Sequence, residues 1–364
     1  MEIVFLGTAS NNPTPVRGVS ATCFRYEGEV WLIDAGEGTQ TQFMKSTVKP
    51  GKITKIFITH LHGDHIFGLP GLMCTIGQNI VENKKLEIYG PVGLRRFLRT
   101  SLELSRSMVT YSYSVHELVP IDEQIPDDIK KWNIVQTEDS YLHPSEILGK
   151  QIVINKNGHW DLFETDLISV KAGWIRHRVA TFGFVIEHKP QQGSLDVEGL
   201  KAAGVRPGPL YKKIKSGENV TLENGAIIEA SKFVGPEKPG KKITILGDCY
   251  GVSEQTIQIA KNSDLLIHEA TLEDSFKEKA ISNGHSTPSM ASIVANKINA
   301  KCLILSHFSQ RYKPLSYFIE KNIDPTKLDP NDEEIECVQK LVDEAKLTFN
   351  GSCIAAYDFF SYRV

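Results

Sequence analysis

Short apolar runs rich in β-branched residues recur along the 364-residue chain. Turn-forming or charged residues bound each run, a pattern typical of buried strands. The clearest runs are residues 53–59, 243–246, 265–267 and 302–305. Between them, residues 253–261 and 287–297 carry the spacing of amphipathic helices. The alternation of such strands and helices predicts a layered α/β protein.

One segment departs from this rhythm. Residues 189–225 are rich in glycine and proline and carry little apolar periodicity. We therefore expect a single domain over residues 1–364, with residues 189–225 inserted in it as an arm. Residues 121–160 are also irregular, but they indicate no function.

The composition is that of an ordinary globular protein with a substantial core, with 41% hydrophobic and 23% charged residues. A net charge of −3 gives no overall basic footprint, so a polyanionic partner would need a local basic patch. No run approaches the roughly 18 apolar residues of a membrane span, and no leader pattern opens the chain. We expect a protein without membrane association, kept in the cytoplasm with the nucleus as a second compartment. The six scattered cysteines are expected to be reduced thiols.

Four polar side chains with metal-binding groups follow the strand-like residues 53–59 within a single turn. They are His60, His62, Asp64 and His65. Imidazole nitrogen and carboxylate oxygen are the ligand atoms that zinc takes. So short a segment cannot easily surround one ion, and we expect it to serve two neighbouring metals. The alternative, a polar turn that caps the next helix, requires three histidines and an aspartate to coincide within six residues.

Further ligand candidates follow other apolar runs, since α/β sheets gather their sites at the carboxyl ends of strands. These are Asp248, His268 and His307, together with His177 after the mixed residues 170–176. Taken singly, each has an ordinary alternative as a helix cap or a hydrogen-bonded packing residue.

Asp34 is the type of buried carboxylate that orients a metal-binding histidine, and its alternative is a simple turn aspartate. Two zinc ions with two aspartates would leave the site positive. Such a site suits an anionic phosphodiester.

Thr59-His60-Leu61-His62-Gly63-Asp64-His65, with Asp34, Asp248 and His307, resembles the metallo-β-lactamase superfamily. That resemblance implies an αββα sandwich. Within the superfamily, five blocks resemble the short form of ribonuclease Z, the family of tRNA 3′-processing endonucleases: residues 5–8, 34–40, 268–271, 284–287 and 307–312. The similarity runs from residue 5 to about residue 360.

The resemblance implies two Zn²⁺ per subunit. One is held by His60, His62, His177 and Asp248, and the other by Asp64, His65, Asp248 and His307. Asp64 is then the general base. His268 becomes a proton donor or a contact for the phosphate rather than a metal ligand.

The resemblance also makes residues 189–225 an arm that grips tRNA. Between residues 201 and 215 the chain has no acidic residue and five basic ones: Lys201, Arg206, Lys212, Lys213 and Lys215. Basic side chains at such density are phosphate contacts, and the alternative is a solvated basic loop. Arg17 and Arg311 are further predicted substrate contacts. In the first loop only Pro13 and Arg17 match the family's motif, so the response to a 3′ CCA end is not predicted.

Together these features predict an endoribonuclease that removes the 3′ trailer of precursor tRNA and works as a homodimer. Two other interpretations keep part of this picture. The same metals would also serve hydrolysis of a small phosphodiester, with the arm irrelevant. A catalytically silent RNA-binding protein would need the arm without the metals, and the complete ligand set argues against it.

Overall fold

The computed structural model describes residues 1–77, 84–125, 127, 141–328 and 335–364. Its contacts divide into two compact units. The main unit comprises Met1–Phe163, Val170–Ile186 and Lys242–Val364. The small unit comprises Glu164–Ser169 and Glu187–Lys241. The predicted arm, residues 189–225, lies wholly within the small unit, which continues to Lys241.

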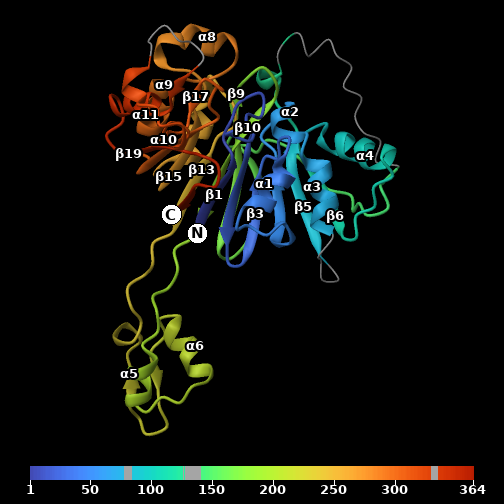
Figure 1. The fold of residues 1–364 in the computed structure, drawn as a ribbon. Coiled ribbons are helices and arrows are strands. Elements are labelled where there is room, and N and C mark those ends of the chain that lie inside the picture. Colours follow the sequence, from blue (N-terminus) through green and yellow to red (C-terminus); the bar gives the residue numbers. More distant parts are fainter. Residues whose placement is uncertain (78–83, 126, 128–140, 329–334) are drawn as a thin grey trace. The chain divides into compact units, whose positions relative to one another are not determined.

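The main unit contains two large sheets (Figure 1). Along the first sheet the order is β20-β1-β2-β3-β4-β5-β6-β7. Neighbouring strands are antiparallel from β20 to β3 and parallel from β3 to β7. The strands of this sheet are β1 (Glu2–Gly7), β2 (Ala21–Tyr26), β3 (Glu29–Ile33), β4 (Ile53–Phe57), β5 (Lys85–Pro91), β6 (Ser112–Leu118), β7 (Gln151–Ile152) and β20 (Ser361–Arg363).

The second sheet has the order β14-β9-β10-β13-β15-β16-β19, and β8 pairs with β9. The strands β13, β15, β16 and β19 run parallel. The strands of this sheet are β8 (Trp160–Glu164), β9 (Ile168–Arg176), β10 (Thr181–His188), β13 (Lys241–Ile245), β14 (Gly251–Val252), β15 (Leu265–Glu269), β16 (Cys302–Ser306) and β19 (Ser352–Ala355).

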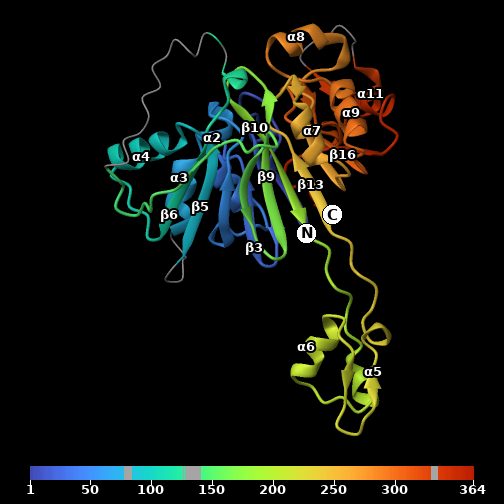
Figure 2. The same ribbon diagram turned by 180° about the vertical axis from the view of Figure 1, so that it is seen from behind.

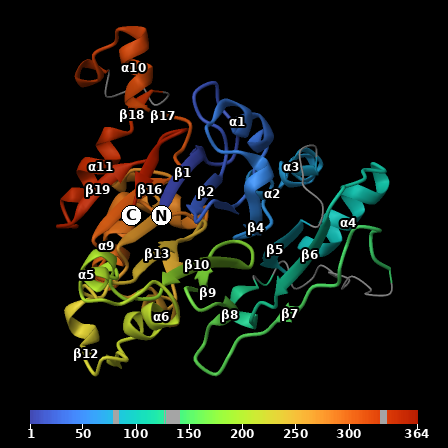
Figure 3. The same ribbon diagram turned by 90° about the horizontal axis from the view of Figure 1, so that it is seen from below.

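Helices cover the outer side of each sheet (Figures 2 and 3). The first sheet is covered by α1 (Thr39–Lys45), α3 (Leu69–Ile76) and α4 (Leu94–Leu104). The second is covered by α7 (Glu254–Ala260), α9 (Pro288–Lys297) and α11 (Gln339–Lys346). The main unit also contains α2 (Gly63–Ile66), α8 (Lys277–Ser282), α10 (Leu315–Lys321) and the pair β17 (Tyr312–Lys313) and β18 (Glu336–Cys337). The predicted αββα sandwich is confirmed.

Alternation along β4 explains why its sequence is apolar without a break. Ile56 belongs to the outer core beneath the helices. Its neighbour Phe57 points to the opposite face, where its ring lies 5.4 Å from that of Phe184 on β10. Both faces of the strand are therefore covered, as in parallel sheets generally. Burial of each such side chain stabilises the fold by about 1.5–3 kcal/mol.

The predicted strand runs all fall on strands of the sandwich, and both predicted helices form. Ser253 caps α7 by accepting a hydrogen bond from the main-chain N–H of Thr256 at 3.1 Å. Pro288 begins α9, where its missing N–H costs nothing. All six cysteines are free thiols, as predicted. Among the helices described, none is long and apolar enough to cross a membrane.

The small unit has its own hydrophobic core. Its elements are α5 (Val197–Ala202), α6 (Pro209–Lys215), β11 (Val220–Thr221) and β12 (Ile227–Ile228). The buried residues are Leu200, Val205, Ile214, Val220, Ile228 and Ala230. Two of these residues lie beyond residue 225, which explains why the unit continues past the predicted end of the arm. Its helices have six and seven residues, too short for their apolar spacing to stand out in sequence.

Candidate metal centre

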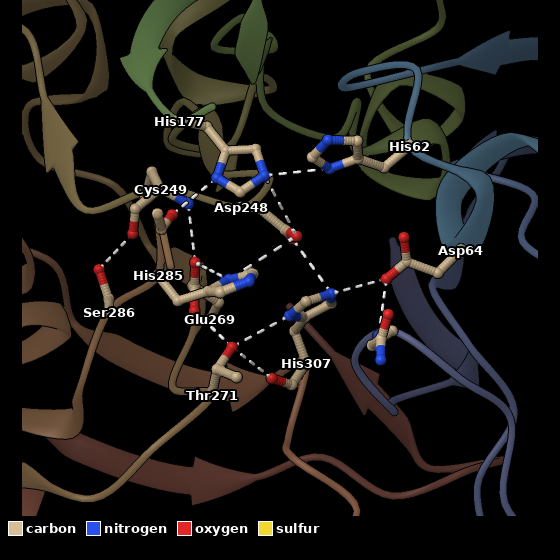
Figure 4. A network of polar contacts seen from close by, with 12 residues as sticks. His62, Asp64, His177, Asp248, Cys249, Glu269, Thr271, His285, Ser286 and His307 are labelled. Atoms are coloured by element: carbon tan, nitrogen blue, oxygen red, sulfur yellow. Dashed lines mark hydrogen bonds and ion pairs between the residues drawn. The ribbon is translucent and has the colours of Figure 1, made fainter. Parts of the chain in front are cut away.

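Four strands of the main unit bring the predicted ligands to one edge of the sandwich. The turn of residues 59–65 links β4 to α2, while His177, Asp248 and His307 follow β9, β13 and β16. Figure 4 shows His62, Asp64, His177, Asp248 and His307 facing one another. The structure thus gathers all seven predicted ligands: His60, His62, Asp64, His65, His177, Asp248 and His307.

Three imidazoles form the first donor group. Nδ1 of His62 lies 3.1 Å from Nε2 of His60 and 3.1 Å from Nε2 of His177. All three donor atoms lie within 4.8 Å of one another. The three nitrogens converge on one point and leave a coordination position open. An open position is typical of a catalytic rather than a structural zinc site.

Asp64, His65, Asp248 and His307 form the second donor group, also within 4.8 Å. Nε2 of His65 lies 3.3 Å from Nε2 of His307, which lies 3.4 Å from Oδ2 of Asp64. Nitrogen and oxygen ligands are mixed here. That mixture suits zinc and other borderline divalent cations.

Asp248 joins the two groups through its two carboxylate oxygens. Oδ2 lies 3.8 Å from Nε2 of His60 and 3.9 Å from Nε2 of His177. Oδ1 lies 3.3 Å from Nε2 of His65 and 3.2 Å from Nε2 of His307. One carboxylate therefore faces both donor groups.

Hydrogen bonds fix the tautomers of the imidazoles that present Nε2. Nδ1 of His177 donates to the carbonyl of Gly284 at 2.7 Å. Nδ1 of His307 lies 3.1 Å from Oγ1 of Thr271. A proton held on Nδ1 leaves the lone pair of Nε2 free, which is the form that binds a metal.

Asp34 does the same for His65. Its Oδ2 accepts the Nδ1 proton of His65 at 2.7 Å, while Oδ1 accepts the main-chain N–H of Thr59 at 2.8 Å. The predicted orienting role of Asp34 is confirmed. Thr59 donates its hydroxyl to Asp34 at 2.8 Å and lies 3.0 Å from Nδ1 of His60. Asp34 thus steadies two imidazoles at once.

The main chain around Asp34 is tightly packed against the histidine turn. Asp34 has φ 58°, a left-handed conformation that aspartate tolerates better than most residues. A methyl group at Gly36 would lie 2.1 Å from the carbonyl oxygen of Asp64. Only glycine permits this approach, which explains the Asp34-Ala35-Gly36 sequence beside the histidine turn.

The electrostatics of the cluster favour bound cations. Burial lowers the pKa of His62 to about 4 and that of His60 well below its ordinary value. Both rings are therefore neutral near pH 7, as metal binding requires. Burial also opposes protonation of His65, but the carboxylates of Asp248 and Asp34 outweigh it and raise the pKa. Donor atoms, tautomers and negative charge all fit a pair of divalent cations.

His268 does not join this cluster, in agreement with the family resemblance, which assigned it no metal. Its side chain is buried, with 1% exposed, and Nδ1 donates to the main-chain oxygen of Glu269 at 2.8 Å. Nε2 lies 3.8 Å from the sulfur of Cys249. Glu269, the next residue of the strand, contacts His285, whereas His268 does not line the cavity that opens beside the donor groups.

The histidine that faces the cluster is His285, a residue with no role predicted from the sequence. Its Nδ1 lies 3.1 Å from Oε1 of Glu269 and 3.8 Å from Oδ2 of Asp248 (Figure 4). Burial alone would lower the pKa of His285, but the charge and hydrogen bond of Glu269 raise it to about 9. The feature of the sequence that could have indicated His285 is the polar block Gly284-His285-Ser286-Thr287 just before α9.

A cavity of about 640 Å³ opens beside the two donor groups. Ligand pockets usually hold about 300–1,000 Å³, so this one can admit a nucleotide-sized group. His62, Asp64, Asp248 and His285 form part of its wall. Asn11, Phe67, Arg178, Lys279 and Gln310 also line it. All of these residues belong to the main unit.

Two predicted substrate contacts lie elsewhere. Arg17 is 1% exposed, and its guanidinium donates to Oγ1 of Thr8 at 2.7 Å and to the carbonyl of Ala356 at 3.1 Å. In this arrangement it supports the first loop from inside and is closed to a substrate. The guanidinium of Arg311 is partly buried over the ring of Phe276, at 5.1 Å. Neither arginine lines the cavity.

The predicted basic contacts of the arm are all exposed side chains of the small unit. Arg206, Lys212, Lys213 and Lys215 lie on or near α6, and Lys201 lies on α5. Lys201 pairs with Glu198 at 2.8 Å. Its charge is therefore partly balanced within the helix.

The sandwich and the two donor groups at its edge define a metal-dependent hydrolase of the metallo-β-lactamase type. Residues 14–149 match the metallo-beta-lactamase superfamily. The chain is 48% identical over 330 residues to human zinc phosphodiesterase ELAC protein 1, covering 89% of this chain and 90% of that protein. It is 36% identical over 367 residues to ribonuclease Z of Bacillus licheniformis, covering 100% and 99% respectively.

A solved structure agrees with these relatives. The crystal structure of human tRNase Z, short form, matches with a TM-score of 0.66 at 35% identity, covering 100% of this chain and 99% of that chain. This chain belongs to the ribonuclease Z family of the metallo-β-lactamase superfamily.

Proposed function

We propose that this protein is a zinc-dependent endoribonuclease that removes the 3′ trailer of precursor tRNA. The cut falls after the discriminator nucleotide and leaves a 3′-hydroxyl on the tRNA and a 5′-phosphate on the trailer. The observation that carries the chemistry is the pair of donor groups joined by Asp248 beside an open cavity. The relatives named ribonuclease Z and tRNase Z support the substrate.

Two zinc ions per subunit fit the donor set. His60, His62, His177 and Asp248 would hold one, and Asp64, His65, Asp248 and His307 the other. When bound, such a pair lowers the pKa of water and withdraws charge from the phosphodiester in both the attack and the departure. The remaining steps fall to side chains of the protein.

Asp64 accepts the proton of the attacking water. Its Oδ2 is fixed by the main-chain N–H of Asn11 at 2.8 Å and lies 3.4 Å from His307. Burial by itself would raise the pKa of Asp64, but the hydrogen bond and charge of His307 with the charge of His65 lower it. The carboxylate is therefore ionised, which is the form that can accept a proton.

His285 is placed to protonate the leaving oxygen. Because Glu269 occupies its Nδ1, the proton that it gives is the one on Nε2. As the water oxygen bonds to phosphorus, the bond from phosphorus to the 3′ oxygen of the discriminator breaks. One proton passes from the water to Asp64, and another passes from His285 to the 3′ oxygen. No negative charge is therefore left on the 3′ oxygen and no extra proton on the attacking oxygen.

The small unit supplies the contact with the body of the tRNA. Its exposed basic side chains suit backbone phosphates and carry no base specificity. We further propose that two subunits form a homodimer in which this unit of one subunit serves tRNA bound to the other. This arrangement rests on the family resemblance, and sedimentation with and without tRNA tests it.

The decisive experiment is incubation of the purified protein with a 3′-extended precursor tRNA, with and without a chelator, followed by mapping of both new ends. We expect chelator-sensitive cleavage after the discriminator, restored by zinc. A small phosphodiester serves as the control for the metal site. Hydrolysis of the small diester without any cut in the precursor would reject the substrate and keep the metal chemistry.

A further inference from the structure

Phe67 is a large apolar side chain open to solvent within a mainly polar cavity. It follows α2 directly, and 64% of its surface is exposed. It lines the same cavity as His62 and Asp64. Leu69 and Leu72 of the next helix are buried in the outer core, so exposure is not a general property of this segment.

The ring of Phe67 packs against neighbouring parts of the protein. A methyl group at Gly63 would lie 2.2 Å from its Cε2, so the ring rests against main chain that a side chain would otherwise cover. The ring of Phe97 on α4 lies 6.5 Å away, tilted by 31°. The ring is thus supported by the main chain at Gly63, and it is one of the residues that line the cavity.

The same cavity also carries cationic side chains. Arg178 and Lys279 line it together with Phe67. Single exposed apolar residues are common and need no explanation, and Met44 is one such residue outside the cavity. A supported aromatic ring and two cations in one cavity match the two parts of a nucleotide, because bases stack on aromatic rings and phosphates attract cations.

We propose that Phe67 is a stacking platform for a nucleobase next to the scissile phosphate. This inference rests on the proposed function and adds to it a subsite for the discriminator base or for the first base of the trailer. Stacking tolerates any base, since every base has a π-face. The platform therefore aligns the strand without reading its sequence.

The first test compares cleavage of precursor tRNA by the wild type, Phe67→Leu and Phe67→Tyr. Leucine keeps the apolar bulk and removes the ring, whereas tyrosine keeps the ring. We expect Phe67→Leu to lower kcat/KM about tenfold and Phe67→Tyr to stay near the wild type. On a precursor with an abasic residue at the stacked position, the wild type and Phe67→Leu should become equal.

Abasic residues at the discriminator and at the first trailer nucleotide are tried separately to find that position. A constant ratio of wild type to Phe67→Leu on the intact precursor and on both abasic precursors would overturn the proposal. Full activity of Phe67→Leu on the intact precursor would do the same. Sedimentation should show the same oligomeric state for all three proteins, and a shift for Phe67→Leu would make the ring a subunit contact instead.

The second test does not depend on cleavage of tRNA. Titration calorimetry measures the binding of AMP and of ribose 5-phosphate, in which a hydroxyl group replaces the base. We expect the wild type and Phe67→Tyr to prefer AMP about tenfold and Phe67→Leu to bind both equally. An undiminished preference in Phe67→Leu would exclude stacking on this ring, even if the wild type cut no precursor tRNA.

Discussion

At the scale of single residues, the first loop fixes Asp64 through a main-chain contact. The N–H of Asn11 donates to Oδ2 of Asp64 at 2.8 Å, and Asn11 has φ 65°. Asparagine and glycine enter this left-handed region readily, whereas a β-branched residue is strained there by about 1–2 kcal/mol. The next residue back, Ser10, is bound to the carbonyl of Phe308 at 2.9 Å, which ties the loop to the His307 turn.

We therefore expect Asn11→Val to lower kcat about tenfold on precursor tRNA and on a small phosphodiester alike. The loss is common to both substrates because it arises from a misplaced Asp64. Asn11→Gly, which accepts the same φ, should remain within a few fold of the wild type. Steady-state kinetics with zinc content measured in parallel give the answer. Equal activity of the valine and glycine variants would show that the contact between Asn11 and Asp64 does not affect catalysis.

The contrast between His285 and His268 gives a second prediction. Loss of a proton donor typically costs about 10²–10⁴-fold in rate. His285→Gln should lower the single-turnover rate by about 100-fold or more. His285 lies in a third donor group with Glu269 and His307, so zinc content is measured in parallel, and an unchanged content assigns the loss to the missing proton donor. His268→Gln, compared at equal folded fraction, should keep most of the rate. A larger loss for His268→Gln would support the role as proton donor or phosphate contact that the family resemblance implied for it.

This pair also shows where sequence reasoning reached its limit. Residue type and position after apolar runs gave eight candidates, His268 among them, and the family resemblance reduced these to the seven that the structure gathers. The direction in which the His268 side chain points could not be predicted from the sequence. The strand Leu265–Glu269 is buried along its whole length, so no polar alternation marks which of His268 and Glu269 faces the site. A family motif quoted as a block carries the same ambiguity.

At the scale of elements, α4 is fastened by a buried ion pair. Nε of Arg99 lies 2.6 Å and Nη2 2.9 Å from the two oxygens of Glu146, whose side chain is 0% exposed. Breaking a buried pair of this kind costs about 3–5 kcal/mol, because one charge stays in the interior. Exposed pairs contribute about 1 kcal/mol or less.

We therefore expect Glu146→Gln to lower the free energy of unfolding by about 3 kcal/mol in urea titrations at constant zinc. The matched control is Glu2→Gln, which removes the partly exposed partner of Arg25 at 2.9 Å and should change stability by under about 1 kcal/mol. Similar effects of the two substitutions would show that Arg99 finds water or another acceptor.

Elements with strong periodicity were predictable, and short ones were not. The runs that became β4, β13, β15 and β16 are continuous because both faces of each strand are covered. In the small unit, helices of six and seven residues complete too few turns to display a repeating apolar face. The hydrophobic core of the small unit could therefore not be predicted from the sequence.

At the scale of the whole molecule, the charge of the small unit predicts salt-dependent binding. Lys212 and Lys213 are exposed on α6. Changing both to alanine should weaken tRNA binding uniformly and make the slope of log K against log salt shallower by about 0.9 for each phosphate that is no longer neutralised. Hydrolysis of a small phosphodiester should not change. Parallel losses on both substrates would assign these lysines a structural role.

The chain's entry into and exit from the small unit permit a sharper test. Gln191 and Lys238 exchange two main-chain hydrogen bonds, of 2.9 and 2.8 Å, and form an antiparallel bridge. Such a bonded pair can be closed by a two-residue Asn-Gly turn in place of residues 192–237. The small unit's buried core lies within that segment, so the excision leaves the core clusters of the main unit intact.

We expect the excised protein to keep its zinc and its small-diester activity within about twofold, while its affinity for tRNA falls at least tenfold at moderate salt because the basic side chains of α5 and α6 are removed. Undiminished tRNA affinity would reject the small unit as the tRNA-binding part, whereas loss of zinc as well would mean that excision disturbs the main fold.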